Sequence, residues 1–137
     1  MKGLVLDCSV VLAWCFEDES SRYADRVLAH LETGEAHVPT IWPLEVANAL
    51  LVAERRKRLA EMDTGRFVSL LEGLPIAVDH DTPNQAFGPT MRLARSAGLS
   101  AYDAAYLELA MRRGLPIATL DAKLKKAAKR LSAKLFA

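Results

Sequence analysis

Residues 4–9 read Leu4-Val5-Leu6-Asp7-Cys8-Ser9. The three apolar residues predict a short buried β-strand, because a brief apolar run that ends at a polar residue is typical of a strand covered on both faces. Ser9 is a good helix cap, so we expect a helix over residues 10–16 directly afterwards. This arrangement places an acid at the carboxyl end of the first strand, where parallel α/β folds carry their functional groups.

The alternation of short apolar runs and amphipathic segments continues along the chain. Further strands are expected at residues 36–38, 75–78 and 117–120, with a last edge strand at 134–136. Helices are expected over 20–34, capped by Ser20 or Ser21, and over 43–58, 63–72, 82–98 and 100–113, with a final one after Asp121. This order predicts an α/β fold with a central parallel sheet of four to five short strands, covered by helices on both faces.

Length and composition are those of one globular domain over residues 1–137. Apolar residues make up 51% of the chain and charged residues 26%, which is enough for a single core. No apolar run approaches the roughly 20 residues that span a bilayer. The amino terminus lacks the apolar stretch and cleavage site of a signal peptide. We therefore expect a cytoplasmic protein without membrane contact.

The net charge of +1 is unevenly distributed. Residues 101–137 carry a net charge of +5, and the rest of the chain carries −4. A basic segment beside acidic residues suits a polyanionic substrate next to a metal site. A basic segment alone is better explained as a helix face exposed to solvent. The charge distribution therefore does not by itself predict a nucleic-acid substrate.

Four acids occupy positions where a carboxylate is unfavourable unless it binds something. Asp7 and Asp121 follow the first and fourth predicted strands, and Glu45 and Asp103 lie in first turns of helices on otherwise apolar faces. An inward-facing acid costs free energy unless it is paired or binds a cation, and neighbouring carboxylates raise one another's pKa. Because oxygen ligands select hard ions, the sequence predicts a Mg²⁺ or Mn²⁺ site formed by these four acids.

Each acid taken alone also has an ordinary explanation. Asp7 and Asp121 can cap the helices that follow them, Asp103 can belong to a capping box, and Glu45 can complement a helix dipole. The metal site is preferred because it explains all four positions together. Three nearby polar residues can orient a carboxylate or a bound water, namely Ser9, Asn48 and Thr119.

Four segments also match the pattern of a known family. They are Leu6-Asp7-Cys8-Ser9, Pro43-Leu44-Glu45-Val46-Ala47-Asn48-Ala49-Leu50, Leu99-Ser100-Ala101-Tyr102-Asp103-Ala104-Ala105-Tyr106-Leu107-Glu108-Leu109-Ala110 and Ala118-Thr119-Leu120-Asp121-Ala122-Lys123-Leu124. With these segments the chain resembles the PIN domain, and in particular the VapC toxins of bacterial and archaeal toxin–antitoxin pairs. The segments span nearly the whole chain in the family's order, and the third is the most specific.

The resemblance implies a three-layer α/β/α sandwich and a Mg²⁺- or Mn²⁺-dependent endoribonuclease. Asp7, Glu45, Asp103 and Asp121 would be its catalytic and metal-binding acids, with Asp7 and Asp103 as the direct ligands. The resemblance also implies a homodimer and a small antitoxin protein that blocks the site.

The predicted reaction is hydrolysis of an RNA phosphodiester by metal-activated water. Glu45 or Asp121 would accept the proton of the water, and Arg112 or Lys123 would contact the RNA backbone. Tyr102 and Tyr106 lie one helical turn apart, which is the spacing of core residues or of a surface pair that stacks on bases.

Three alternatives remain open at this stage. A receiver-type signalling domain would need adjacent acids after the first strand, but Asp7 is followed by Cys8, and Asp79 would have to be its phosphate acceptor. A phosphatase would need a second aspartate where this chain has Ser9. A non-catalytic RNA-binding or scaffold domain would share the fold, but it would not need all four acids.

Overall fold

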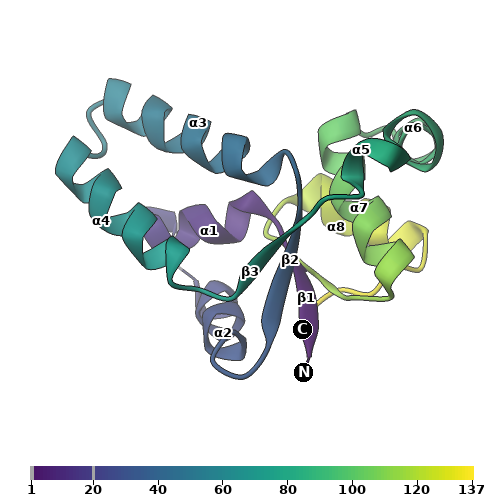
Figure 1. Cartoon of the computed structure of the whole chain (residues 1–137), viewed down its shortest axis with the longest axis horizontal. Coiled ribbons are helices and arrows are strands. Elements are labelled where there is room, and N and C mark those ends of the chain that lie inside the picture. Colours follow the sequence, from purple (N-terminus) through teal and green to yellow (C-terminus); the bar gives the residue numbers. More distant parts are fainter. Residues whose placement is uncertain (1, 20) are drawn as a thin grey trace.

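A computed structural model describes residues 2–19 and 21–137 and shows four parallel strands in the order β3-β2-β1-β4 (Figure 1). The strands are Gly3–Leu6 (β1), Glu35–Pro39 (β2), Ile76–Asp79 (β3) and Ile117–Ala118 (β4). The apolar residues of β1, Leu4, Val5 and Leu6, have no exposed surface, because β1 pairs with β2 and β4 and is covered on both faces. The predicted parallel sheet is therefore confirmed.

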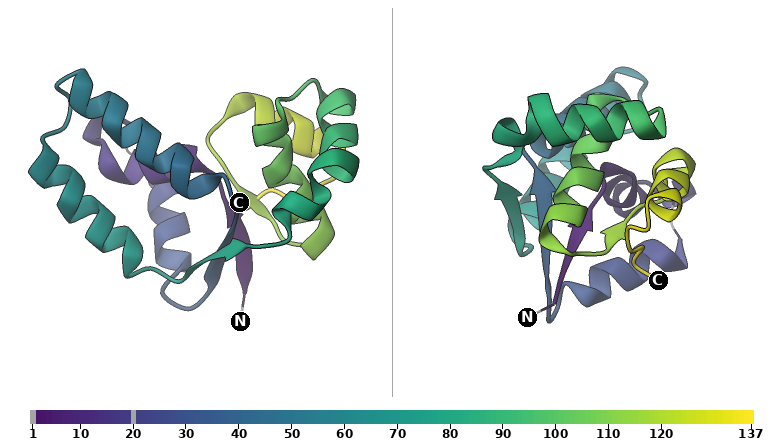
Figure 2. Two further views of the ribbon diagram at one scale, coloured as in Figure 1. Left: turned by 45° about the horizontal axis from the view of Figure 1, so that its top comes forward. Right: turned by 90° about the vertical axis from the view of Figure 1, so that its right-hand side faces the viewer.

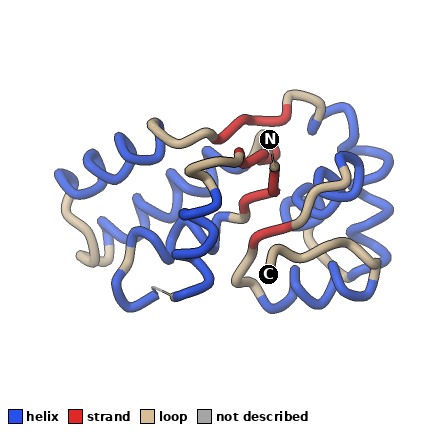
Figure 3. The backbone as a smooth tube through the Cα atoms, turned by 90° about the horizontal axis from the view of Figure 1, so that it is seen from below, coloured by secondary structure: helices blue, strands red, loops and turns tan. Residues whose placement is uncertain are grey.

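Helices form a layer on each side of the sheet, as Figures 1 and 2 show. One layer contains α1 (Cys8–Cys15), α2 (Arg22–His30), α3 (Trp42–Arg55) and α4 (Glu61–Glu72), together with a short 3₁₀ turn, η1 (Glu17–Glu19). The other contains α5 (Thr82–Gln85), α6 (Met91–Ala97), α7 (Ala101–Arg113) and α8 (Ala122–Arg130). Figure 3 shows the strands between these two groups, which confirms the three-layer α/β/α sandwich. None of the described helices is long and apolar enough to cross a membrane.

The helix α7 is the most enclosed element of the second layer. Seven consecutive residues, Ala104 to Ala110, are buried, since α7 packs against β1, β2 and neighbouring helices. Ser100 caps its start by accepting a hydrogen bond from the backbone N–H of Asp103 at 3.1 Å. Gly114, with φ of 65°, ends it in the left-handed conformation that glycine adopts without strain. Both ends of α7 are thereby fixed, and so is the position of Asp103 in its first turn.

The boundaries of α1 and α2 follow from the residues before them. The helix α1 begins at Cys8, two residues before the predicted start, with Asp7 in extended conformation just before it. Ser21 caps α2 through a 3.0 Å hydrogen bond from the backbone N–H of Ala24. Ser20, the alternative cap, lies outside the described residues.

The prediction of one continuous helix over residues 82–98 is wrong. The segment is divided into α5, a π-helical turn η2 (Ala86–Thr90) and α6. Pro89 lies inside that turn, and a proline has no N–H to donate and crowds the carbonyl four residues earlier. The regular helix therefore cannot pass through this position.

The last two predicted strands are shorter than expected. The strand β4 stops at Ala118 because the N–H of Leu120 donates to the hydroxyl of Ser9, at 2.9 Å, rather than to a neighbouring strand. The segment 134–136 contributes a single parallel bridge between Leu135 and Ile117. This bridge continues the sheet beyond β4 without forming a full fifth strand.

Candidate active site

The four predicted acids come from four different elements. Asp7 follows β1, Glu45 is in the first turn of α3, Asp103 is in the first turn of α7, and Asp121 directly precedes α8. Their charges act on one another: Asp121 and Asp103 raise the pKa of Asp7, and Asp7 and Asp103 raise the pKa of Glu45. Side chains that are far apart in the sequence therefore lie near enough to one another, at the carboxyl edge of the sheet, for their charges to interact.

Asp7 is the most enclosed of the four, with 7% of its surface exposed. The hydroxyls of Ser9 and Thr119 both donate to its Oδ2 atom, each at 2.7 Å. Burial raises the pKa of Asp7, the two hydrogen bonds oppose this, and the charges of Asp121 and Asp103 add to it. The side chain makes no capping hydrogen bond to α1. Helix capping therefore does not explain this acid.

The two hydroxyls that hold Asp7 are themselves fixed by the backbone after β4. Ser9 accepts from the N–H of Leu120 at 2.9 Å, and Thr119 accepts from the N–H of Asp121 at 3.0 Å. Each hydroxyl has one hydrogen, so accepting from the backbone leaves that hydrogen for Asp7. Both bonds go to Oδ2, and Oδ1 of Asp7 receives no hydrogen bond from the described residues. This oxygen remains available for a cation.

Glu45 is held by a residue from the opposite helical layer. The hydroxyl of Tyr106 donates a hydrogen bond to Oε1 of Glu45. Burial raises the pKa of Glu45, the tyrosine hydrogen bond opposes this, and the charges of Asp7 and Asp103 add to it. Burial and the hydrogen bond to Glu45 also raise the pKa of Tyr106, so its phenol stays protonated and remains a donor.

Sequence reasoning gave Tyr106 only a packing or stacking role. The structure separates the two tyrosines of the pair, because Tyr106 has no exposed surface and Tyr102 is 61% exposed. A signal was present in the sequence: a buried tyrosine needs a partner for its hydroxyl. The position of Glu45, 61 residues earlier, could not be inferred from local spacing.

Asp103 and Asp121 complete the group. Burial and the charge of Asp121 raise the pKa of Asp103, while Ser100 and Lys123 lower it. Asp121 caps α8, since its Oδ1 accepts from the N–H of Leu124 at 3.0 Å. Helix capping thus explains the role of Oδ1 of Asp121, but it does not explain the role of Oδ2.

Asn48 was expected to orient Glu45 from one helical turn away. It lies on the exposed side of α3, and within residues 2–19 and 21–137 no hydrogen bond joins it to Glu45. Its role as an orienting residue therefore stays a prediction. Ser9 and Thr119, by contrast, both contact Asp7.

The chemistry of these donors fits a hard divalent cation. In the described part of the chain, none of the four acids forms an ion pair with lysine or arginine, although burial and mutual repulsion raise the pKa of Asp7, Glu45 and Asp103. No three carboxylate, histidine or cysteine side chains among the described residues already stand close enough to share one ion. Mg²⁺ does not require such a cage, because it usually binds through one or two carboxylates and keeps several waters.

Cys8 lies beside the acids but is not suited to act as a nucleophile. Burial and the charges of Asp7 and Glu45 raise its pKa to about 12. A thiol attacks as the thiolate, and this one stays protonated near neutral pH. Cys8 is therefore a partly buried neighbour of the acids and not a nucleophile.

Arg112, predicted to contact the RNA backbone, is already engaged within the protein. Its guanidinium lies 2.5 Å from Asp79 and 2.8 Å from Glu108, and 3.7 Å from Asp81. The side chains of Asp79 and Glu108 are only 7% and 6% exposed. This arginine therefore joins the end of β3 to α7, and Lys123 remains as the predicted RNA contact.

The family model that describes the PIN domain matches residues 4–130. The chain belongs to the PIN-domain family. A curated relative, ribonuclease VapC3 of Pyrobaculum aerophilum, is 31% identical over 121 residues, which cover 88% of this chain and 91% of the relative. Membership in the PIN family sets aside the receiver and phosphatase alternatives, and Asp79 has a structural role in the ion-pair cluster around Arg112.

A solved structure shows the same PIN fold. The crystal structure of PAE2754 from Pyrobaculum aerophilum superposes with a TM-score of 0.67 at 23% sequence identity. The match covers 93% of this chain and 86% of that protein. At this level of identity the likeness concerns the fold alone.

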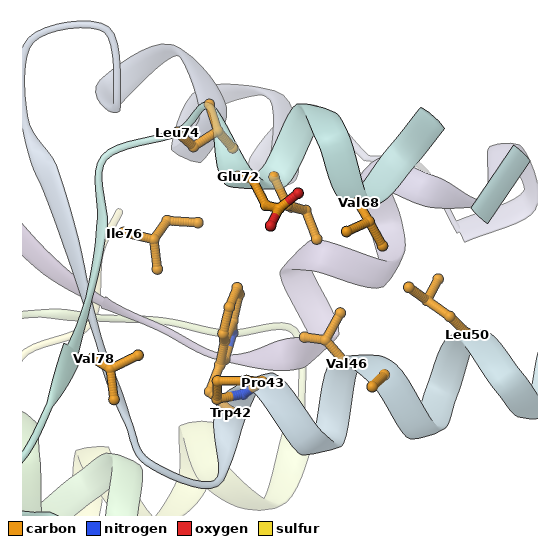
Figure 4. Close-up of a pocket in the computed structure, with 11 residues that line it drawn as sticks. Trp42, Pro43, Val46, Leu50, Val68, Glu72, Leu74, Ile76 and Val78 are labelled. Atoms are coloured by element: carbon orange, nitrogen blue, oxygen red, sulfur yellow. The ribbon is translucent and has the colours of Figure 1, made fainter. Parts of the chain in front are cut away.

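The PIN domain also has an apolar pocket, separate from the four acids, between α3, α4 and β3 (Figure 4). Its volume is about 330 Å³, and its walls include Trp42, Leu50, Val68 and Ile76. The indole nitrogen of Trp42 is buried without a hydrogen-bond partner among the described residues. None of the four acids lines this pocket. It is therefore not part of the acidic site.

Proposed function

We propose that this PIN domain is a Mg²⁺- or Mn²⁺-dependent endoribonuclease and the toxin of a VapBC-type toxin–antitoxin pair. The observation that carries the proposal is the clustering of Asp7, Glu45, Asp103 and Asp121 from four elements, with no lysine or arginine in an ion pair with any of them in the described chain. The similarity to a protein named ribonuclease VapC3 supports the same function.

Each acid has a proposed role. Asp7, through Oδ1, and Asp103 are the direct ligands, and Glu45 and Asp121 complete the site. A bound divalent cation supplies a Lewis acid for the phosphoryl oxygen and lowers the pKa of a coordinated water. Glu45 is the proposed general base, because a carboxyl group whose pKa is raised toward the working pH is a better proton acceptor. Ser9 and Thr119 keep Asp7 in place.

The proposed partners follow from the same function. The substrate is RNA. Its phosphate backbone would lie against Lys123 and the other exposed lysine and arginine side chains of α8. A small antitoxin protein would block the acidic site, and the toxin would act as a homodimer in the cytoplasm. A non-catalytic PIN domain is the competing possibility, and the experiments below separate the two.

The first test is metal dependence. We expect the purified protein to cleave RNA with Mg²⁺ or Mn²⁺ and to lose that activity in EDTA. A cation that binds only the folded state at one hundred times its dissociation constant stabilises it by about 2.7 kcal/mol, which is a rise of roughly 10 °C in Tm for a chain of this size. Thermal denaturation with and without Mn²⁺ measures the shift. An unchanged Tm together with no cleavage would favour the non-catalytic alternative.

The second test is the pH dependence of stability without metal. The folded state raises the pKa of Asp7, Glu45 and Asp103, so it binds their protons more tightly than the unfolded state does. Their contribution to stability is present below the unfolded pKa, about 4, and is lost as the pH rises through the folded values. We expect Mn²⁺ to restore stability at neutral pH and to have little effect at pH 3.5. Chemical denaturation at several pH values measures the free energy of unfolding with and without Mn²⁺. An equal stabilisation by Mn²⁺ at neutral pH and at pH 3.5 would contradict this expectation.

The third test concerns the support of Asp7. Thr119→Val removes one of the two hydroxyls that hold Asp7 and leaves the backbone N–H of Asp121 without its acceptor. Loss of such a supporting group typically costs 10–100-fold in metal affinity or activity, and we expect a loss in this range. Isothermal titration with Mn²⁺ measures it. Thr119→Ser keeps the hydroxyl and should recover most of the affinity; equal losses in both variants would contradict the role of the hydroxyl.

A further inference from the structure

Tyr106 is an apolar-core residue with one polar atom to satisfy. Its side chain has no exposed surface, so its hydroxyl must find a partner inside the protein. That partner is Oε1 of Glu45, on a helix of the opposite layer. The contact therefore crosses from α7 to α3.

The two partners differ in mobility. Tyr106 lies in the buried stretch of α7, where packing from all sides restricts its rotamer. Glu45 is only partly buried in the first turn of α3, and its side chain has three rotatable bonds. No other hydrogen bond to the Glu45 carboxylate exists among the described residues. The fixed member of the pair is thus the tyrosine.

The same helix carries a second acid of the site. Asp103 lies three residues before Tyr106, so the two side chains project from adjacent turns of α7. Through Asp103 the helix contributes one carboxylate directly, and through Tyr106 it holds another that belongs to α3. One helix, α7, therefore influences the positions of two of the four acids.

We propose that Tyr106 is a positioning residue for the nuclease reaction, whose hydroxyl fixes Glu45 through Oε1 and leaves Oε2 for the acidic site. This inference rests on the proposed function and names a residue that acts through Glu45 rather than on the substrate. A competing account is that Glu45 merely satisfies a buried hydroxyl. In that case removal of the hydroxyl changes stability but neither Mn²⁺ affinity nor turnover.

The test compares two substitutions on one helix that each remove a single hydroxyl. Tyr106→Phe is expected to weaken Mn²⁺ binding or to lower kcat by about 10–100-fold, with KM for RNA within about two-fold, as for other groups that orient metal ligands. Tyr102→Phe, at an exposed position one turn earlier, is the matched control. Its Mn²⁺ affinity, kcat and KM for RNA should each stay within about two-fold of the wild-type values. Unchanged Mn²⁺ affinity and kcat in Tyr106→Phe would overturn the inference.

A cycle with Glu45→Gln separates the two accounts further. If Tyr106 acts through the Glu45 carboxylate, Tyr106→Phe should produce little additional loss of Mn²⁺ affinity in the Glu45→Gln background. Full additivity of the two losses would overturn the inference. A wild-type protein that binds Mn²⁺ but cleaves no RNA would refute only the proposed function. The Mn²⁺ affinities of the single and double variants would still test whether Tyr106 acts through Glu45. A wild-type protein that binds no Mn²⁺ would refute both.

A second measurement does not depend on the folding of Tyr106→Phe. The chain has three tyrosines, so incorporation of 3-fluorotyrosine gives three ¹⁹F NMR signals that Tyr23→Phe and Tyr102→Phe assign. Addition of Mg²⁺ to the wild-type protein should shift the Tyr106 signal, and Glu45→Gln should remove most of that shift. A Tyr106 signal that ignores Mg²⁺ while the protein binds the ion would contradict the inference.

Discussion

Asp7→Asn is expected to reduce RNA cleavage by about a thousand-fold or more, which corresponds to roughly 4 kcal/mol of transition-state stabilisation. Asparagine has the shape of aspartate and keeps an oxygen that can accept from Ser9 and Thr119, so the fold is retained. The substitution removes the negative charge that would bind the cation. Single-turnover cleavage of a defined RNA in Mg²⁺ measures the loss.

The same substitution should make the metal-free protein more stable at neutral pH. Burial and the neighbouring acids raise the pKa of Asp7, so its ionised form destabilises the folded state above that pKa. A neutral asparagine removes this cost, and chemical denaturation at pH 7.5 in EDTA should show a higher free energy of unfolding. Asp25→Asn, the same change at an exposed position of α2, is the control. It should alter neither RNA cleavage nor the free energy of unfolding in EDTA. An active Asp7→Asn protein would refute the assignment of Asp7.

Arg112→Ala is expected to lower the free energy of unfolding by about 3 kcal/mol, near the lower end of the range for breaking a buried ion pair. The substitution leaves the carboxylates of Asp79 and Glu108 nearly buried and without their cation. We choose the lower end because 26% of the Arg112 side chain is exposed, so water can partly replace it. Urea denaturation measures the loss.

This effect should depend on pH in a defined direction. Burial acts against ionisation of Asp79, but hydrogen bonds from Arg112 and Thr82 outweigh it and hold the pKa of Asp79 below its ordinary value. The stability from this pair is therefore present above the unfolded pKa, about 4, and is lost as the pH falls through the folded value. The difference between wild type and Arg112→Ala should shrink on acidification. Arg113→Ala, at the next and exposed position, should change stability by less than about 0.5 kcal/mol, and a loss equal to that of Arg112→Ala would contradict the role of the cluster.

Local sequence patterns were sufficient to locate the four strands, although not the end of the fourth, and to place each acid on its element. Leu4-Val5-Leu6 has too few residues for a stable helix and no polar side for water, so it predicts a central strand, and Asp7 must then follow at its carboxyl end. The same reasoning placed Asp121 after β4. The interruption at Pro89 was also visible in the sequence, because a proline seven residues into a predicted helix removes a backbone donor.

Contacts between distant segments were beyond such reasoning. The partner of Tyr106 is 61 residues away and the partner of Arg112 on β3 is 33 residues away, and no periodicity links positions on different elements. A buried tyrosine indicates that its hydroxyl has a partner, whereas nothing in the local sequence distinguishes Arg112 from Arg113. Which partner it is depends on how α3, α7 and β3 pack, and packing is a property of the assembled layers.

The pairing of β1 with β4 has a consequence for the order in which the acidic site assembles during synthesis. A nascent chain that has not yet reached residue 117 already contains Asp7, Glu45 and Asp103, but it lacks the strand that brings Thr119 and Asp121 beside Asp7. The acidic site can therefore be completed only after β4 and residues 119–121 have been synthesised and β4 has paired with β1.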